Sequence, residues 1–277
     1  MGEYAGRTAV ITGAGSGLGA AMADLFGEAG ANLVLLDIDG PRAEAKAAEL
    51  RGRGIEAMAL PVDVADKASL ARAAEAARAR FGAVHVLCAN VGVQQFGAAD
   101  TLTDQDWQWV LSVNVMGVIH TVNAFLPLLR AGEGDRHVVI TSSCSFFQLG
   151  ARMGAYVASK FAVTGYGEVL RQELAAEGIN VTLVFPGGMP TRHLESSRAS
   201  RPPALGESRF DMADVQVMMA SAEISADHVA TPAHAVRNLL RDLASGEPYI
   251  ITHGTYRAQV EARQQAVLRA FDRMAAN

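Results

Sequence analysis

Tyr156 and Lys160 have the residue types and the spacing for proton transfer. They form a Y-x-x-x-K motif in a segment of helical periodicity, so both side chains lie on one face of the helix. A phenol ordinarily titrates near pH ~10, and a neighbouring ammonium favours the phenolate and lowers that pKa. The pair is therefore predicted to exchange a proton with a substrate oxygen, although such pairs also occur on exposed helix faces. Several hydroxyl side chains lie just before this pair, and the sequence leaves open which of them assists the proton transfer: Thr141, Ser142, Ser143 and Ser145.

A glycine-rich turn near the N-terminus has the pattern of a phosphate-binding loop. Gly13, Gly17 and Gly19 lie where the first predicted strand leads into a helix. A turn without side chains lets the backbone approach a pyrophosphate, whose charge then lies at the helix N-terminus. Leu18 takes the place of the third glycine of the common G-x-G-x-x-G fingerprint, so the loop instead has the form T-G-x-x-x-G-x-G. A simple tight turn is the alternative interpretation.

Asp37 ends the second predicted strand and indicates which dinucleotide is bound. A carboxylate at this place accepts hydrogen bonds from the ribose hydroxyls and repels a 2′-phosphate. The next residues, Ile38 and Asp39, supply no basic side chain, and neither does Ser16 in the turn. The sequence therefore predicts NAD rather than NADP. A solvated acid at a strand end is the alternative.

The elements that must position these residues alternate along the chain. Helical patterns lie near 17–29, 41–53, 66–80, 104–131, 155–177 and 232–244. Short apolar runs predict strands at Thr8–Thr12, Asn32–Asp37, Ile55–Pro61, Val84–Ala89, His137–Ser142, Asn180–Phe185 and Tyr249–Thr252. Strands that are apolar almost throughout are buried on both faces. The pattern predicts an α/β fold: a doubly wound, Rossmann-type parallel sheet of about seven strands with helices on both faces, forming one domain over 1–277.

Two segments stand outside this alternation. Residues 187–231 are predicted to be an irregular insertion that acts as a substrate loop or lid. Residues 254–277 are predicted to be a C-terminal extension, with one amphipathic helix over about 255–275. Trp107 to Leu129 holds no Asp, Glu, Lys or Arg, but its polar residues favour a helix buried against neighbours or a partner subunit over a membrane span.

Composition excludes several classes of protein. Of 277 residues, 50% are hydrophobic and 19% are charged, which is ordinary for a globular chain and excludes a disordered one. The net charge of −5 argues against nucleic acid or an anionic membrane as a partner. Cys88 and Cys144 fit no metal or redox spacing, so no metal site is expected, and two buried thiols indicate a reducing, cytoplasmic compartment.

The motifs together resemble those of the short-chain dehydrogenase/reductase family over about residues 6 to 191. T-G-x-x-x-G-x-G is followed by Asp63-Val64, by Asn90-Val91-Gly92 and by Y-x-x-x-K. The resemblance implies that Asp63 contacts the adenine amino group, that Val64 lines the adenine pocket, and that Asn90 supports the sheet and the cofactor ribose. The usual N-N-A-G motif is reduced here, because Ala89 and Val91 replace two of its residues.

The resemblance also implies a catalytic tetrad of Asn114, Ser143, Tyr156 and Lys160. Ser143 would bind the substrate oxygen, with Ser145 as the runner-up, and Lys160 would hold the nicotinamide ribose. Asn114 would kink its helix and hold a water that relays protons to Lys160. In the P-G-x-x-x-T motif, the backbone of Met189 and the hydroxyl of Thr191 would bind the carboxamide, and Pro186 and Gly187 would also contact the cofactor. The cofactor-binding set implied in full is Gly13, Ser16, Gly17, Leu18, Gly19, Asp37, Ile38, Asp63, Val64, Asn90, Gly92, Tyr156, Lys160, Pro186, Gly187, Met189 and Thr191.

The substrate is expected to be apolar and possibly aromatic. Phe146, Phe147, Met212, Met218 and Met219 suggest this, although ordinary core positions explain each of them as well. The predicted substrate-binding residues are Gln94, Ser143, Ser145, Phe147, Met153 and Tyr156. The arginines at 192, 198, 201 and 209 have two interpretations, contacts to an acidic substrate or a solvated face, of which the second is favoured.

The predicted function is an NAD(H)-dependent oxidoreductase that interconverts a secondary alcohol and a ketone, a small-molecule substrate. The alternatives are a catalytically silent nucleotide-sensing binding protein and an epimerase or dehydratase on the same fold. Members of the family pair subunits through the helices at 104–131 and 155–177, so a homodimer or homotetramer is expected. Of the three lysines, Lys46 and Lys67 are expected to be ordinary surface cations, whereas Lys160 is expected not to tolerate replacement by arginine.

Overall fold

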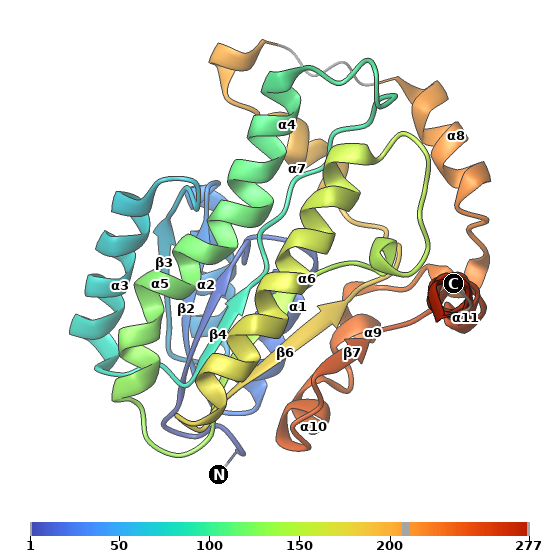
Figure 1. Cartoon of the computed structure of the whole chain (residues 1–277). Helices are drawn as coiled ribbons and strands as arrows, with labels where there is room; N and C mark the ends of the chain where they lie inside the picture. The colour runs from blue at the N-terminus through green and yellow to red at the C-terminus, as the bar shows by residue number, and fades with distance from the viewer. Residues whose placement is uncertain (1, 207–210, 276–277) are drawn as a thin grey trace.

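A parallel sheet of seven strands runs through the molecule in the order β3-β2-β1-β4-β5-β6-β7 (Figure 1). The computed structural model describes residues 2–206 and 211–275. The strands are β1 Thr8–Thr12, β2 Asn32–Asp37, β3 Ala57–Pro61, β4 Val86–Ala89, β5 Arg136–Thr141, β6 Ile179–Phe185 and β7 Tyr249–Ile251. All neighbouring strands are parallel. The predicted Rossmann-type fold is confirmed, with strand ends within two residues of those expected.

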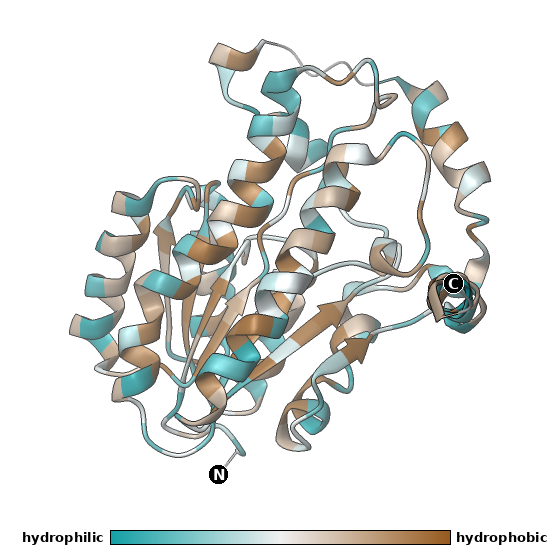
Figure 2. Cartoon of the chain, in the orientation of Figure 1, coloured by the Kyte–Doolittle hydropathy of each residue, from teal (hydrophilic) through white to brown (hydrophobic). Residues whose placement is uncertain are grey.

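Helices connect the strands and cover both faces of the sheet. They are α1 Gly17–Glu28, α2 Gly40–Gly52, α3 Lys67–Phe81, α4 Asp104–Leu111, α5 Gly117–Ala131, α6 Gly154–Ala175, α7 His193–Ala199, α8 Met212–Ser221, α9 Pro232–Val236, α10 Leu239–Ala244 and α11 Arg257–Ala275. Side chains of a strand alternate between its faces. In β1, Val10 packs with α3, α5 and α6, while Ala9 and Ile11 pack with α1, α2, α9 and α10. The strands are accordingly almost wholly hydrophobic (Figure 2).

The run predicted as one helix over 104–131 contains a π-helical turn at Ser112–Met116, between α4 and α5. The N–H of Gly117 donates to the carbonyl of Ser112, one residue further back than in an α-helix. This run is the one helix of the described chain that is long and apolar enough to cross a membrane. Phe125 and Leu129 are fully buried against the sheet, so the run is a core helix of a soluble fold.

The two segments outside the alternation are largely helical. Residues 187–231 contain α7, α8 and short 3-10 turns, so the expected irregular chain is wrong for much of this segment. Its residues 207–210, with Arg209, lie outside the described residues. The helix α11 at Arg257–Ala275 occupies the place of the predicted C-terminal helix, and its position near the chain end is seen in Figure 1.

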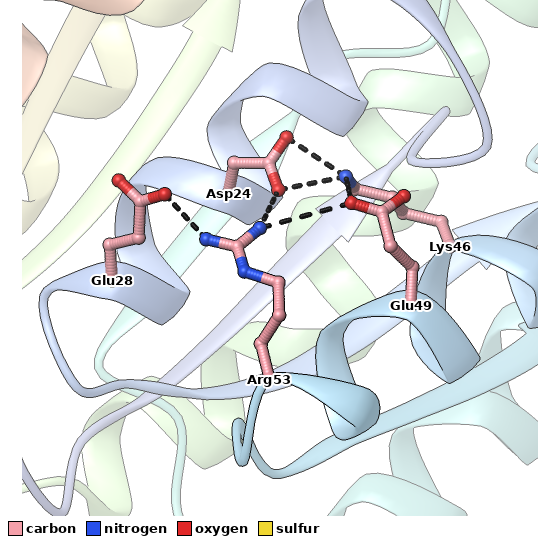
Figure 3. Close-up of polar contacts among 5 residues, drawn as sticks. All are labelled: Asp24, Glu28, Lys46, Glu49 and Arg53. Atoms are coloured by element: carbon pink, nitrogen blue, oxygen red, sulfur yellow. Dashed lines mark hydrogen bonds and ion pairs between the residues drawn. The ribbon is translucent and has the colours of Figure 1, made fainter.

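An ionic cluster joins α1 to α2 (Figure 3). Lys46 donates to both carboxylate oxygens of Asp24, at 2.8 and 2.9 Å, and to Glu49 at 3.0 Å. Arg53 bridges Asp24, at 2.8 Å, and Glu28. The Lys46 side chain is only 11% exposed. The prediction that Lys46 is an ordinary surface cation is therefore wrong, because it holds two helices together.

Candidate active site

A cavity of about 980 Å³ opens at the carboxyl ends of the strands. Parallel α/β sheets bind ligands at this edge, where the strand order reverses, which here is between β1 and β4. The lining residues that directly follow a strand are Gly13 after β1, Ile38 after β2, Val62 after β3, Asn90 after β4, Ser142 after β5 and Pro186 after β6. One cavity therefore collects most of the residues singled out in the sequence.

The glycine-rich loop is shaped by close backbone contacts. Gly13 and Gly17 have φ of +68° and +55°, a region that L side chains rarely adopt. A Cβ on Gly19 would lie 2.1 Å from the carbonyl oxygen of Gly13, so only glycine allows α1 to start this close to β1. Gly13 and Gly17 line the cavity, as do Ser16 and Leu18. Gly19 does not line the cavity, and its role is to let α1 pack closely against the end of β1.

Asp37 lies at the cavity wall and already orders the glycine-rich loop. Its carboxylate accepts hydrogen bonds from the N–H of Gly15 at 2.9 Å and of Asp39 at 3.0 Å. Burial raises the pKa of this carboxyl. Arg42, which no sequence motif marks, also lines the cavity, but its guanidinium is paired with Asp39 at 2.9 Å. The acid at the end of β2 thus faces the place expected for a ribose. The neighbouring residues Ile38, Asp63 and Val64 line the same wall.

Asn90 ties together the strands beneath the cavity. Its Nδ2 donates to the carbonyl of Thr12 at 3.1 Å, and its Oδ1 accepts from the Thr141 hydroxyl at 3.1 Å. Its own N–H donates to the Thr12 hydroxyl at 2.9 Å. These bonds link β1, β4 and β5 at their carboxyl ends. The support of the sheet expected of Asn90 is therefore present in the contacts, despite the reduced motif around it.

Ser143, Tyr156 and Lys160 meet at the centre of the cavity. Ser143 lies beside Tyr156, and its hydroxyl favours the phenolate form of Tyr156. The Lys160 amine lies 5.5 Å from the Tyr156 ring centroid and donates to the carbonyl of Thr141 at 3.0 Å. Ser143 comes from the end of β5, whereas the other two come from α6. The helical spacing of Y-x-x-x-K does place both side chains in one cleft.

The pKa values at this centre are governed by burial. Burial raises the pKa of the Tyr156 phenol to about 12, and the hydrogen bond with Ser143 works in the opposite direction. Burial also lowers the pKa of the Lys160 amine to about 8. The expected lowering of the Tyr156 pKa by its neighbour is thus outweighed by desolvation. Further positive charge beside the phenol is needed to bring its pKa into the neutral range.

Asn114 stands behind the cavity in the π-helical turn and is fully buried. Its Oδ1 accepts from the N–H of Val93 at 2.7 Å, and its Nδ2 donates to the carbonyl of Val93 and the hydroxyl of Ser159. Its side chain thus fastens the loop after β4 to α6, next to Lys160. Gly92 lies between them, where a Cβ would be 3.4 Å from the Lys160 amine. Asn114 does not line the cavity itself.

The remaining predicted residues divide into those at the cavity and one elsewhere. Gln94, Ser145 and Met153 line the cavity, as do Pro186, Gly187, Met189 and Thr191. Phe147 does not: its ring packs on Phe185, at 4.7 Å between centroids, and on Tyr256, at 5.9 Å. The placement of Phe147 at the substrate pocket is therefore wrong, because the chain turns its ring toward the C-terminal segment. Of the other methionines that suggested an apolar substrate, Met218 lines the cavity, while Met212 and Met219 are exposed.

The cavity also contains residues that were not expected from the sequence, among them Trp109, His193 and Tyr256, together with Arg201 in its buried position. The ring of His193 lies edge-on to Tyr156, 6.4 Å between centroids. Tyr256 stacks on His228 at 4.9 Å, and its hydroxyl lies where a Cβ on Gly187 would be only 2.8 Å away. Tyr256 immediately precedes α11, so the C-terminal extension contributes directly to the wall. The proline pair at 202–203 is the one sequence feature that marks this end of the cavity.

Comparison with known proteins places the chain in a family. The model of the short chain dehydrogenase family matches residues 7–202, and this protein belongs to that family. A C alpha-dehydrogenase of Sphingobium sp. (strain NBRC 103272 / SYK-6) is 32% identical over 269 residues, which are 97% of this chain and 87% of the relative. The protein is thus a short-chain oxidoreductase.

Two solved structures with NAD share the fold. A short chain dehydrogenase/reductase from Burkholderia phymatum in complex with NAD is 32% identical, with a TM-score of 0.88 over 98% of this chain and 97% of the other. A short chain dehydrogenase from Mycobacterium paratuberculosis bound to NAD is 26% identical, with a TM-score of 0.77 over 90% of this chain and 97% of the other. The likeness therefore extends through the C-terminal part.

Proposed function

We propose that this protein is an NAD(H)-dependent dehydrogenase that interconverts a secondary alcohol and a ketone on a small apolar or aromatic substrate. The observation that supports this best is the pair of neighbouring hydroxyls of Ser143 and Tyr156, with the buried Lys160 amine beside them. Two neighbouring hydroxyls can both turn to a substrate oxygen placed between them. The proposed site therefore has a donor, an acceptor and a fixed cation at one point.

The residues of the wall fit NAD. The backbone of Gly13 and Gly17 borders the cavity without side chains, and Asp37 offers a carboxylate at its rim. Gly13, Gly17 and the N-terminus of α1 would hold the pyrophosphate, and Asp37 would accept from the adenosine ribose. Bound NAD supplies the ring that accepts or gives up the hydride. Asp37 would repel a 2′-phosphate, and Arg42 is already paired with Asp39, so the residues favour NAD over NADP.

The chain's own residues account for the proton in this scheme. In the oxidation direction the phenolate of Tyr156 takes the proton of the substrate hydroxyl, and in reduction the phenol returns it. The Ser143 hydroxyl donates to the same oxygen and stabilises its developing charge. Lys160 would hold the nicotinamide ribose and contribute positive charge next to the phenol. Behind these groups, Asn114 holds the loop after β4 against the helix α6.

The substrate end of the cavity is apolar apart from a few placed polar groups. Its walls include Phe96, Trp109, Met153, Val215 and Met218. Ligand sites are commonly built in this way, with an apolar body and a small number of hydrogen-bonding groups. The segment 187–231, which contributes several of these residues, is proposed as the substrate loop. The name of the Sphingobium relative, a C alpha-dehydrogenase, agrees with oxidation at a carbon that bears a hydroxyl.

The helices α5 and α6 are proposed to pair subunits in a homodimer or homotetramer. The π-turn Met116 is 40% exposed, and on α6 Phe161 and Val169 are 37% and 54% exposed. Apolar side chains of this size on two neighbouring helices are typical of a subunit interface. Cys88 and Cys144 are both free thiols, which agrees with the proposed cytoplasmic location.

Replacing the proposed acid/base tests the function most directly. Tyr156→Phe removes one hydroxyl and keeps the ring, so turnover of NAD with a panel of secondary alcohols should fall at least about 100-fold while NAD still binds. Tyr166→Phe is the matched control, since Tyr166 lies on the same helix and packs against the core. NADH absorbance gives the rate and calorimetry the binding. Equal activity of Tyr156→Phe and the wild type would refute the proposal.

The cofactor preference has its own test. Asp37→Ala removes the carboxylate that would accept the ribose hydroxyls and repel a 2′-phosphate. We expect the ratio of kcat/KM for NAD over NADP to fall by about tenfold or more, from loss of the charged hydrogen bond and of the repulsion. The same variant loses the bond from Gly15, so its thermal midpoint must be recorded beside the kinetics. An unchanged NAD/NADP ratio would contradict the assigned role of Asp37.

A further inference from the structure

Arg201 is a buried cation at the substrate end of the cavity. Its side chain is only 5% exposed, and Nη2 pairs with the Asp106 carboxylate at 2.8 Å. Its Nε donates to the carbonyl of Gly206 at 3.0 Å, and Nη2 also donates to the carbonyl of Leu205 at 3.1 Å. The guanidinium lies 5.2 Å above the ring of Trp109. Four contacts therefore fix this group, and the favoured interpretation of a solvated arginine is wrong here.

The remaining nitrogen of Arg201 has no partner. Nη1 is buried and forms no hydrogen bond within the described chain. A buried donor left unpaired is unfavourable, and native structures keep few of them without a functional reason. Three further buried polar atoms without a partner in residues 2–206 and 211–275 also belong to residues of the cavity wall: Oγ of Ser145, Nε2 of His193 and the hydroxyl oxygen of Tyr256. Unpaired polar atoms thus gather where the substrate is proposed to bind.

The charges around these atoms select an uncharged ligand group. The Arg201 charge is already balanced by Asp106, which lies on α4 and is itself largely buried. His193 is neutral at pH 7, because burial and the charge of Lys160 lower its pKa to about 4. A carboxylate on the substrate would therefore be repelled by Asp106, because the charge of Arg201 is already paired with that side chain. A hydroxyl, ether or carbonyl oxygen meets no such repulsion.

We propose that Arg201 is a specificity-determining residue that donates through Nη1 to a second, uncharged oxygen of the substrate, remote from the reacting carbon. The substrate class is a ring-bearing alcohol or ketone with an added hydroxyl, ether or carbonyl oxygen. The apolar body lies against Trp109 and its neighbours, and the reacting oxygen lies at Ser143 and Tyr156. This inference rests on the proposed function and adds to it the chemistry of the far end of the substrate.

Matched ketones provide the test. The probes are acetophenone, the three methoxyacetophenones and 4-acetylbenzoate, each measured in reduction with NADH and by calorimetry on the NADH-bound enzyme. In the wild type, one methoxy isomer should exceed acetophenone in kcat/KM by about tenfold, and the carboxylate should be the poorest. Arg201→Gln should abolish that methoxy advantage. Arg201→Lys keeps a positive charge toward Asp106 and should also abolish the methoxy advantage. This variant replaces Arg201→Gln in the test if Arg201→Gln does not fold.

Two further variants separate specificity from structural support. Asp106→Asn leaves Arg201 unbalanced, so 4-acetylbenzoate should gain at least about tenfold relative to acetophenone. Arg198→Gln, an exposed position on α7, should leave every ratio unchanged. If Arg201→Gln lowers kcat/KM and binding equally for all probes and also lowers the thermal midpoint, Arg201 has only a structural role and the inference is wrong. If the wild type reduces no probe, the proposed function fails, and the calorimetric ratios still decide the role of Arg201.

Discussion

Lys46 and Lys160 are both largely buried, but carboxylates surround the amine of Lys46 and uncharged groups surround that of Lys160. Lys46, between α1 and α2, contacts carboxylates on two sides, from Asp24 and Glu49 (Figure 3). Lys160 is 3% exposed and has a carbonyl and a phenol ring as neighbours, with no ion pair among the described residues. Its pKa falls to about 8 for that reason. The fold thus neutralises the charge of Lys46 and leaves that of Lys160 unpaired among the described residues.

The largest expected difference between the two lysines is in catalysis. Lys160→Arg keeps the charge, but a planar guanidinium cannot occupy the place of a compact ammonium between Thr141, Tyr156 and Gly92. We expect turnover to fall about 100-fold or more, measured by NADH formation at saturating alcohol. Lys46→Arg is the matched variant and should keep wild-type turnover. Similar losses of turnover in Lys160→Arg and Lys46→Arg would contradict the different roles assigned to the two lysines.

A smaller effect is expected on the pH dependence of stability. Between pH 8 and 10 the unfolded chain keeps its Lys160 proton, since the ordinary pKa is 10.5, whereas the folded chain has lost it. The unfolded state then binds more protons, so the contribution of Lys160 to the free energy of unfolding rises with pH, by up to about 1.4 kcal/mol per unit.

Urea denaturation of the wild type and of Lys160→Met at pH 7, 8, 9 and 10 measures this contribution. The wild type should gain stability relative to the variant across this window. Above pH 10 the comparison ends, because ordinary tyrosines titrate there while the pKa of Tyr156 is raised to about 12. A difference that stays flat from pH 7 to 10 would show that Lys160 keeps its proton in the folded protein.

The smallest effect belongs to the ionic cluster itself. Lys46→Ala leaves Asp24 with Arg53 as its remaining partner, and should lower the free energy of unfolding by about 1 kcal/mol, with kcat/KM unchanged. High salt should reduce this difference, because the cluster is partly exposed. Lys67→Arg, at an exposed position that starts α3, should change neither quantity. Thermal denaturation at two salt concentrations checks both variants.

The sheet and the proposed catalytic centre follow directly from local sequence patterns. The strands are short apolar runs buried on both faces, and Tyr156 and Lys160 are four residues apart on one helix. Such features need only neighbouring residues to be read. The π-turn around Asn114 is different, because it accompanies bonds from Asn114 to Val93 and Ser159, which are distant along the chain. A periodicity argument therefore predicts a continuous helix there.

The substrate end was the least predictable part of the molecule. Arg201 becomes buried through Asp106 and Trp109, which lie on another element almost a hundred positions earlier. A single arginine in a polar segment carries no mark of such a contact, so a solvated face was the natural expectation. The prediction that Phe147 lies at the substrate pocket was wrong for the same reason, since its neighbour Tyr256 lies far along the chain. Similarly, the partner of Lys46 is on α1 and could not be read from α2 alone.

The position of Tyr256 has a consequence for the order in which the molecule forms. Its ring lies beside Gly187 and stacks on His228, and Gly187 borders the cavity. Since synthesis proceeds from the N-terminus, the sheet from β1 to β6 can assemble before residue 256 has been added. The wall beside Gly187 is completed only after that residue has been made. Completion of the cavity is thus a later event in synthesis than assembly of these strands.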